Sequence, residues 1–249
     1  MLFVLCGMAQ AFEPVTEEVS GGHIDWSEMR LEVTVTSQHT TGAWQDRRLQ
    51  EQDAHDRLTS LIDDIASDIA LTPTTTASAL MSKGDALADR LSDGLRRWGV
   101  EEARYHTGGV ALDAVLDLRT WLAPALIEQA LTADLPIEGG ATGLLIDARG
   151  HRVPLTLSPE LTTTTGRRLV HVSALSEDTA RMRTPVIYVR DPADPRATAR
   201  AGDAPLFATI GEVREGVMIL DDASAGRLMA QSQLAALVAA GRVVVVVDQ

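Results

Sequence analysis

Hydrophobic and polar residues alternate over residues 29–35, and a period of two predicts a half-buried β-strand. After a break at Gly42 the period changes, because apolar residues recur every three or four positions from Trp44 to about Ala70. This spacing predicts a long amphipathic helix whose apolar positions are Leu58, Leu61, Ile62, Ile65 and Ile69. The threonine-rich stretch 72–76, which contains Pro73, is predicted to end this helix.

Further elements are predicted before residue 135. Glycine suits the backbone conformations that end helices and turn hairpins, and threonine can cap a helix N-terminus. In order, the expected elements are a helix over 77–98 ended by Gly99, strands over 102–106 and 110–118 joined at Gly108-Gly109, and a helix from Thr120 to Leu131.

The second half of the chain contains shorter apolar runs, which favour strands, with two helical patterns among them. The expected strands cover 144–146, 153–157, 169–172, 186–189, 206–213, 217–220 and 243–247. A short helix is expected after Ser176, and a longer one over 222–240 is expected to begin at a cap formed by Asp221 or Asp222. Residues 191–203 contain two prolines and are expected to form a loop. Five consecutive valines, 243–247, predict a central strand.

Residues 136–140 interrupt the regular pattern and are predicted to separate two adjacent units. Residues 21–135 are expected to form an α+β domain in which helices pack on a small antiparallel sheet. Residues 140–249 are expected to form an α/β domain, a mixed sheet with covering helices. The predicted fold class is therefore α+β or α/β, in two units.

The first residues resemble the end of a secretory signal. A short apolar run over residues 2–8 precedes Ala9-Gln10-Ala11, so residues 1–11 are predicted to be signal-peptide-like, with cleavage after Ala11. The basic n-region is missing, which means that the start site is placed too late or the signal is incomplete. Two alternatives stay open: Cys6, the only cysteine, as a lipid acceptor, or a buried N-terminal strand of a cytosolic protein. After this segment no stretch reaches the roughly 20 apolar residues of a membrane span.

The acidic composition narrows the range of partners. The formal net charge is −13, and residues 1–132 carry 21 acidic against 10 basic residues. Nucleic-acid binding is not expected, since phosphate contacts need a basic surface. The charge of the first half is interpreted as solvated helix faces.

Two segments resemble a known family. They are Gly22-His23-Ile24-Asp25-Trp26, followed by a strand and a long helix, and Thr142 to Gly150, which reads TGLLIDARG. Both are similar to segments of a family of bacterial envelope proteins that includes the N-terminal region of flagellar assembly protein T and related small secreted lipoproteins. In residues 35–39 the chain departs from the glycine-containing stretch of that family. The resemblance implies a periplasmic or envelope-associated protein without a described catalytic activity, with an assembly role in some members.

Catalytic, metal-binding and cofactor motifs are not found in the sequence. The six histidines show no His-Glu-x-x-His pattern, and no phosphate-binding loop is present. His55 lies among acidic residues, where either a metal ligand or a solvated side chain fits. His23 beside Asp25 fits either an acid/base pair or a local Asp25 cap with Trp26 packed as an anchor, and the second interpretation is preferred.

Asp147 and Arg149 follow a strand predicted to be buried, which is where open α/β sheets often place ligand-binding groups. The competing interpretation is an Asp–Arg pair that fixes the turn into Gly150, and we favour it. The candidate ligand or structural residues are therefore Asp25, Trp26, Asp147 and Arg149, with no catalytic residue, metal or cofactor assigned.

The sequence favours a secreted, non-enzymatic periplasmic protein, associated in some settings with the outer membrane. It would act through contacts with other envelope proteins, in assembly of a surface appendage or an outer-membrane complex. The first alternative is a periplasmic module that binds a small ligand or a cell-wall fragment near Asp147, Arg149 and His151. The second is a divergent hydrolase that uses His23 and Asp25.

Overall fold

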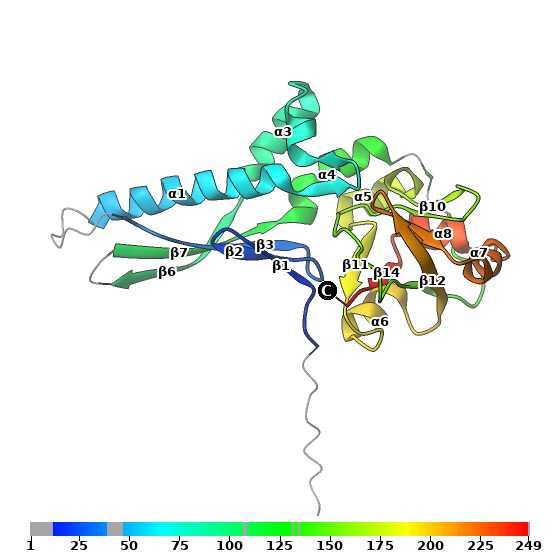
Figure 1. Cartoon of the computed structure of the whole chain (residues 1–249). Coiled ribbons are helices and arrows are strands. Elements are labelled where there is room, and N and C mark those ends of the chain that lie inside the picture. The colour runs from blue at the N-terminus through cyan, green and yellow to red at the C-terminus, as the bar shows by residue number, and fades with distance from the viewer. Residues whose placement is uncertain (1–11, 39–46, 107–108, 131, 134, 249) are drawn as a thin grey trace, which may run out of the picture.

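Two β-sheets and their helices form the protein, which confirms an α+β fold in two units (Figure 1). The computed structural model describes residues 12–38, 47–106, 109–130, 132–133 and 135–248. The predicted signal-like segment, residues 1–11, lies outside the described residues. The domain boundary predicted at 136–140 falls between the last helix of the first unit and the first strand of the second.

The first unit is an antiparallel sheet with helices on it. Its strands, in the spatial order β1-β2-β3-β7-β6, are Thr16–Val19, Gly22–Asp25, Arg30–Thr36, Gly109–Asp117 and Gly99–His106. The long helix α1, Arg47–Asp68, packs on β3 and β7 (Figure 1). The predicted strand 29–35 and long helix are confirmed, and β6 pairs with β7 as expected of the predicted hairpin. Gly42, Trp44 and Gly108, where the break, the helix start and part of the hairpin turn are predicted, lie outside the described residues. The hairpin β1–β2 was not predicted, because its strands are short and mostly polar.

The predicted helix over 77–98 is wrong, because it is two helices. They are α2, Ala77–Met81, and α3, Ala86–Leu95, and they follow a small hairpin of β4, Ala70–Thr72, and β5, Thr75–Thr76. Gly84 has φ +64°, a left-handed conformation that interrupts a helix, and the Asp85 carboxylate then accepts from the N–H groups of Leu87 and Ala88. Gly99 begins β6 instead of capping a helix.

The helix predicted to begin at Thr120 begins earlier. It is α4, Leu118–Gln129, and the Asp117 carboxylate caps it by accepting from the Thr120 N–H at 3.0 Å. Aspartate is a stronger cap than threonine, and the backbone leaves β7 directly into the helix.

The second unit is a mixed seven-stranded sheet. Its strands, in the spatial order β10-β9-β13-β12-β8-β14-β11, are Arg168–Val170, Leu161–Thr162, Val217–Leu220, Pro205–Arg214, Gly143–Asp147, Val243–Val246 and Val186–Val189. The last four run parallel to one another, so their carboxyl ends share one edge. The valine strand β14 lies inside the sheet, as predicted.

Helices cover both faces of this parallel part. One face packs against α6, Pro195–Ala201, and the other packs against residues that include Leu234 and Val238 of α8, Leu234–Ala239. The remaining helical segments are η2, Val172–Ala174, α5, Glu177–Met182, and α7, Asp222–Met229. None of the helices that the structure describes has both the length and the apolar character to cross a membrane.

Three predictions for this unit are wrong. Residues 191–203 are not only loop, since the Asp194 carboxylate caps α6 by accepting from the Arg196 N–H. The helix predicted over 222–240 is two helices, α7 and α8. Residues 153–157 form no strand of the sheet. Instead the N–H groups of Leu157 and Ser158 donate to the Ala70 and Leu71 carbonyls, so this segment lies along β4 of the first unit.

A tight turn after β2 joins the two units (Figure 1). The Ser27 hydroxyl donates to the Tyr188 carbonyl at 2.7 Å and accepts from the Val15 N–H at 2.9 Å, and Trp26 meets the Tyr188 ring edge-on. Nearby, the Arg190 Nε donates to the Pro14 carbonyl. The carboxyl end of β11 is therefore covered by residues of the first unit.

The core is continuous across this joint. One cluster of buried apolar side chains includes Leu31 and Leu58 of the first unit together with Ile146 and Val245 of the second. Tyr188 is fully buried at the joint, and its hydroxyl donates to the Thr156 carbonyl. Burial raises the pKa of Tyr188 to about 12. Burial of these apolar side chains therefore stabilises both units together.

Ser27→Ala is expected to destabilise the protein by about 1–3 kcal/mol, because the buried Val15 N–H loses its acceptor and the Tyr188 carbonyl its donor. Chemical denaturation measures the change. The control Ser92→Ala replaces an exposed serine of α3 and should stay within about 0.5 kcal/mol of wild type. Equal stability of the two variants would show that the Ser27 contacts do not hold the joint.

Candidate functional site

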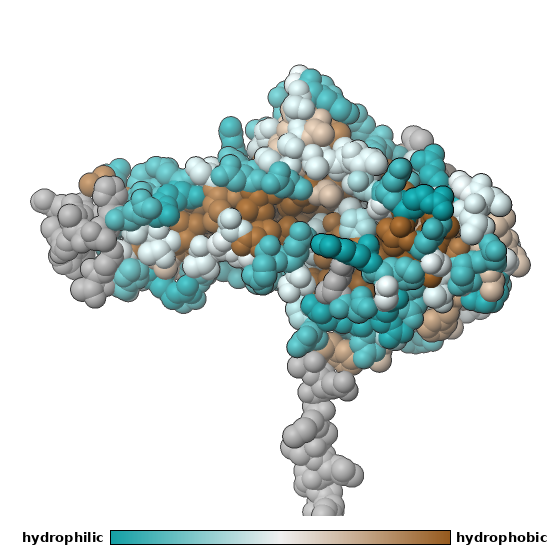
Figure 2. All heavy atoms as spheres, in the orientation of Figure 1, coloured by the Kyte–Doolittle hydropathy of each residue, from teal (hydrophilic) through white to brown (hydrophobic). Residues whose placement is uncertain are grey.

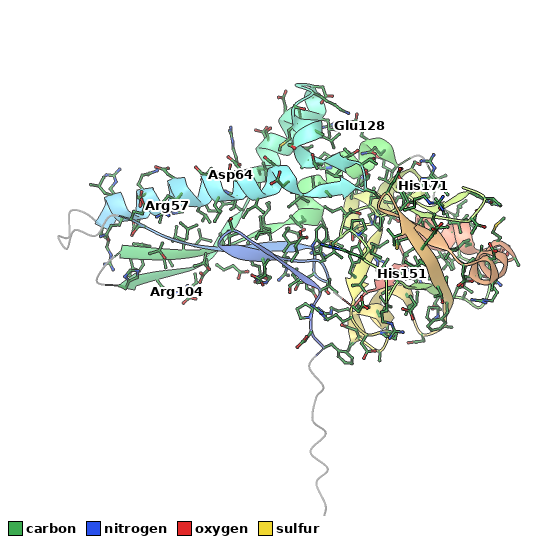
Figure 3. All side chains as sticks on the ribbon, in the orientation of Figure 1. Arg57, Asp64, Arg104, Glu128, His151 and His171 are labelled. Carbon is green, nitrogen blue, oxygen red and sulfur yellow. The ribbon has the colours of Figure 1, made fainter. Side chains whose placement is uncertain are left out.

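A cleft opens between α1 and the β1–β2 hairpin, and we name it the α1 cleft. Its volume is about 390 Å³. Its apolar floor consists of Val19, Ile24, Leu61, Ile65, Ile69 and Leu155, and its rim includes Glu17, Asp64 and Asp68. Figure 2 shows an apolar band below α1 bordered by hydrophilic side chains, and Figure 3 labels Asp64 on the helix.

The packing of α1 explains why the cleft exists. The helix lies on β3 and β7, where Leu58 and Ile62 are fully buried. Beyond β3 the sheet continues into β2 and β1, which are not among the main packing partners of α1. Leu61, one position before Ile62, therefore remains partly exposed at the side of the helix and meets the open part of the sheet.

The rim of the α1 cleft is acidic. Asp64 and Asp68 are exposed and one helical turn apart, and no described basic residue forms an ion pair with either. Like charges at this spacing cost roughly 0.2–0.5 kcal/mol in a helix. The neighbouring Asp63 is affected by the same negative charge. Its pKa is raised by burial and by the Asp64 carboxylate, and Arg96 opposes this with a smaller effect.

Trp26 connects this rim to the joint between the units. Its indole Nε1–H donates to Glu17 Oε2 at 2.9 Å, which holds that carboxylate over the cleft, while the ring itself is buried. Asp25 Oδ1 accepts from the N–H groups of Ser27 and Glu28, at 2.8 and 2.9 Å, and fixes the turn. The structure therefore places Trp26 as an anchor and Asp25 as a local cap.

The acid/base pair considered for His23 and Asp25 is not assembled. The His23 Nε2 lies 3.7 Å from Glu32 Oε2, across the strand pair, and Asp25 is engaged with the turn. His55 stacks on Trp98 with ring centroids 5.8 Å apart. Within the described residues, no group of three or more His, Cys, Asp or Glu side chains is arranged to hold a metal ion.

Asp147 and Arg149 do meet, as an ion pair at the end of β8. Asp147 Oδ1 accepts from Arg149 Nε at 2.8 Å and Oδ2 accepts from Nη2 at 2.6 Å, while the Gly150 N–H donates to Asp248. The hydrogen bond from Arg149 is the main cause that lowers the Asp147 pKa. The pair fixes the turn, and neither residue lines the α1 cleft.

The charged rim was missed by the reasoning from sequence. The signal is present, because Asp64 and Asp68 flank Ile65 on the predicted helix, but the sequence alone favours solvated faces for most of the acidic residues of the first half. Glu17 could not be assigned, since the β1 strand that carries it was not predicted.

Comparison with known proteins finds a similarity for the second unit of the protein. Residues 143–249, from β8 to the end of the chain, match the family model of the second domain of Tp0624 from Treponema pallidum. Among curated proteins no match was found. The second unit is thus similar to a bacterial protein domain, which agrees with the coarser part of the family resemblance. The match contains nothing that concerns flagellar assembly protein T or lipoproteins.

Asp147→Asn is expected to lower the free energy of unfolding by less than about 1 kcal/mol at neutral pH, because the ion pair is partly exposed. The pKa of this carboxyl is lowered in the folded protein, so its contribution is present above the ordinary aspartate pKa and lost as the pH falls. Denaturation of both proteins at neutral and acidic pH measures this, and the difference should vanish in acid. A loss of several kcal/mol would contradict a role confined to the turn.

Proposed function

We propose that this protein is a secreted, non-enzymatic envelope protein that binds a partner protein through the α1 cleft. The observation that carries the proposal is the combination of an apolar floor with rim carboxylates that form no ion pair with a residue the structure describes. A protein segment with apolar side chains and neighbouring lysine or arginine residues complements both features. The proposed role is assembly of an envelope complex or a surface appendage, and the sequence resemblance supports it.

The strand beside the cleft offers backbone contacts as well. β1 is at the edge of its sheet, with β2 on one side and no described strand on the other. An open edge can pair with an extended segment of another chain, and the cleft then receives every second side chain. Apolar residues of the segment would meet Val19 and Leu61, and basic residues would meet Glu17 and Asp64.

The envelope location is part of this proposal. It rests on the signal-like first residues and on the sequence resemblance to bacterial envelope proteins. Fractionation of the native organism should recover the protein outside the cytoplasm, and a cytoplasmic protein would contradict the proposed location.

A synthetic peptide of repeated Leu-Ser-Lys-Ser, in which leucine and lysine fall on the same face of an extended strand, is expected to bind the full chain, and a Leu-Ser-Glu-Ser peptide of equal length is not. The double variant Asp64→Asn, Asp68→Asn should weaken binding of the first peptide by about tenfold, because two of the three rim charges are removed. Isothermal titration calorimetry at low salt measures both affinities, since surface electrostatics weaken as salt rises.

The matched control is Asp89→Asn, Asp93→Asn, which removes two exposed aspartates at the same helical spacing on α3, outside the cleft. This control changes the net charge equally and should leave the affinity near that of wild type. Equal weakening by both double variants would show that the peptide responds only to the total charge, and the cleft would lose its proposed role.

A further inference from the structure

A second cavity, which we name the basic pocket, lies in the second unit. Its volume is about 410 Å³, and it shares no lining residue with the α1 cleft. Residues of β10, η2 and α8 form its wall, together with Thr132 and the segment between α7 and α8. Figure 3 labels His171, one of its residues.

The charge of this pocket contrasts with that of the protein. Arg167, Arg168 and His171 line it, no acidic residue does, and the whole chain has a net charge of −13. Neither guanidinium forms an ion pair with a residue that the structure describes. Two arginines thus line one cavity whose lining contains no carboxylate.

The hairpin that carries the arginines is fixed. Gly166 has φ +81°, which suits the turn, and the Thr163 N–H donates to the Arg167 carbonyl at 2.9 Å. The Thr163 hydroxyl accepts from the Arg167 N–H in return. This arrangement reduces the conformational entropy lost when a ligand binds, because the backbone is already ordered.

His171 supplies a neutral polar group beside the arginines. Its Nδ1 is 2.6 Å from the Ser173 Oγ, and the Ser173 carbonyl accepts from the Thr132 hydroxyl, so the ring is held from one side. Burial is the main cause that lowers the His171 pKa; Arg168 lowers it further, and Glu160 opposes them. The imidazole is therefore mostly neutral at neutral pH.

Thr132, Gln231 and Ser232 add polar groups to those of the arginines and His171, and the other residues of the wall are apolar. Leu169, Ala174, Leu234 and Val238 line the pocket, and Leu169, Leu234 and Val238 also belong to the buried core. A ligand that fills the pocket would therefore need an apolar part against these residues and a negative group against the arginines.

From this arrangement we propose that the basic pocket binds an oxyanion that carries a short apolar chain. Arginine guanidinium groups recognise carboxylate and phosphate oxygens through paired N–H donors, and the leucine and valine side chains receive the apolar chain. This site is independent of the α1 cleft, so a failure of the peptide experiment would leave it untouched.

The test titrates the full chain with hexyl phosphate. Hexanol and hexylamine are the comparison probes, because they have the same alkyl chain but carry no charge and a positive charge, respectively. Hexyl phosphate should bind and shift the His171 resonances in NMR spectra, whereas the other two should not. Arg168→Gln should weaken binding by about tenfold, since it removes one charge-assisted contact. The control Arg214→Gln replaces an exposed arginine of β12 outside the pocket and should bind as wild type does.

A second variant, Ala235→Phe, fills the pocket from an exposed position and should abolish binding while circular dichroism shows an unchanged fold. Vesicles of phosphatidylglycerol and of phosphatidylcholine distinguish the two sources of the anion. Co-sedimentation with the phosphatidylglycerol vesicles alone would assign the anion to a lipid headgroup. If the protein binds hexyl phosphate but does not co-sediment with either vesicle, the ligand is a soluble oxyanion. Equal binding of hexylamine, or wild-type affinity in both Arg168→Gln and Ala235→Phe, would overturn the proposal.

Discussion

The structure depends on one buried turn, at which the first sheet meets the carboxyl end of β11. Ser27 bonds both units there, and the Asp25 carboxylate fixes the backbone that presents it. The turn ends at Met29, whose φ of +58° is unusual for a residue with a side chain and is tolerated because that side chain is buried. Without this turn the apolar residues around Tyr188 would lose their cover.

This constraint limits which surfaces are open for the binding that we propose. In open parallel sheets the carboxyl edge of the strands is the usual ligand site, and here residues of the first unit cover part of it. Asp147 and Arg149 at the same edge bond to each other. Two hollows lie elsewhere, an acidic one beside α1 and a basic one beside β10, and their opposite charges suit the different partners that we propose for them.

The sequence predicted the elements whose residues repeat over many turns or strand positions, such as α1, β3 and β14, and it predicted the two-unit class. The sequence did not predict helix boundaries that a single residue determines, because periodicity averages over such positions. Gly84 interrupts a predicted helix, and Asp194 begins a helix inside a predicted loop. Asp25 and Trp26 are candidates from the sequence alone, but the cleft that Trp26 lines depends on β1, whose short polar strand carries no strong pattern.

The buried turn is expected to make the two units unfold as one cooperative body. Native-state hydrogen exchange in increasing denaturant measures this by following amides of β3 and β7 in the first sheet and of β8 and β14 in the second. Because the apolar core is continuous across the joint, we expect the most protected amides of both sheets to open with the same free energy and the same denaturant dependence. Two distinct opening free energies, one for each sheet, would contradict it.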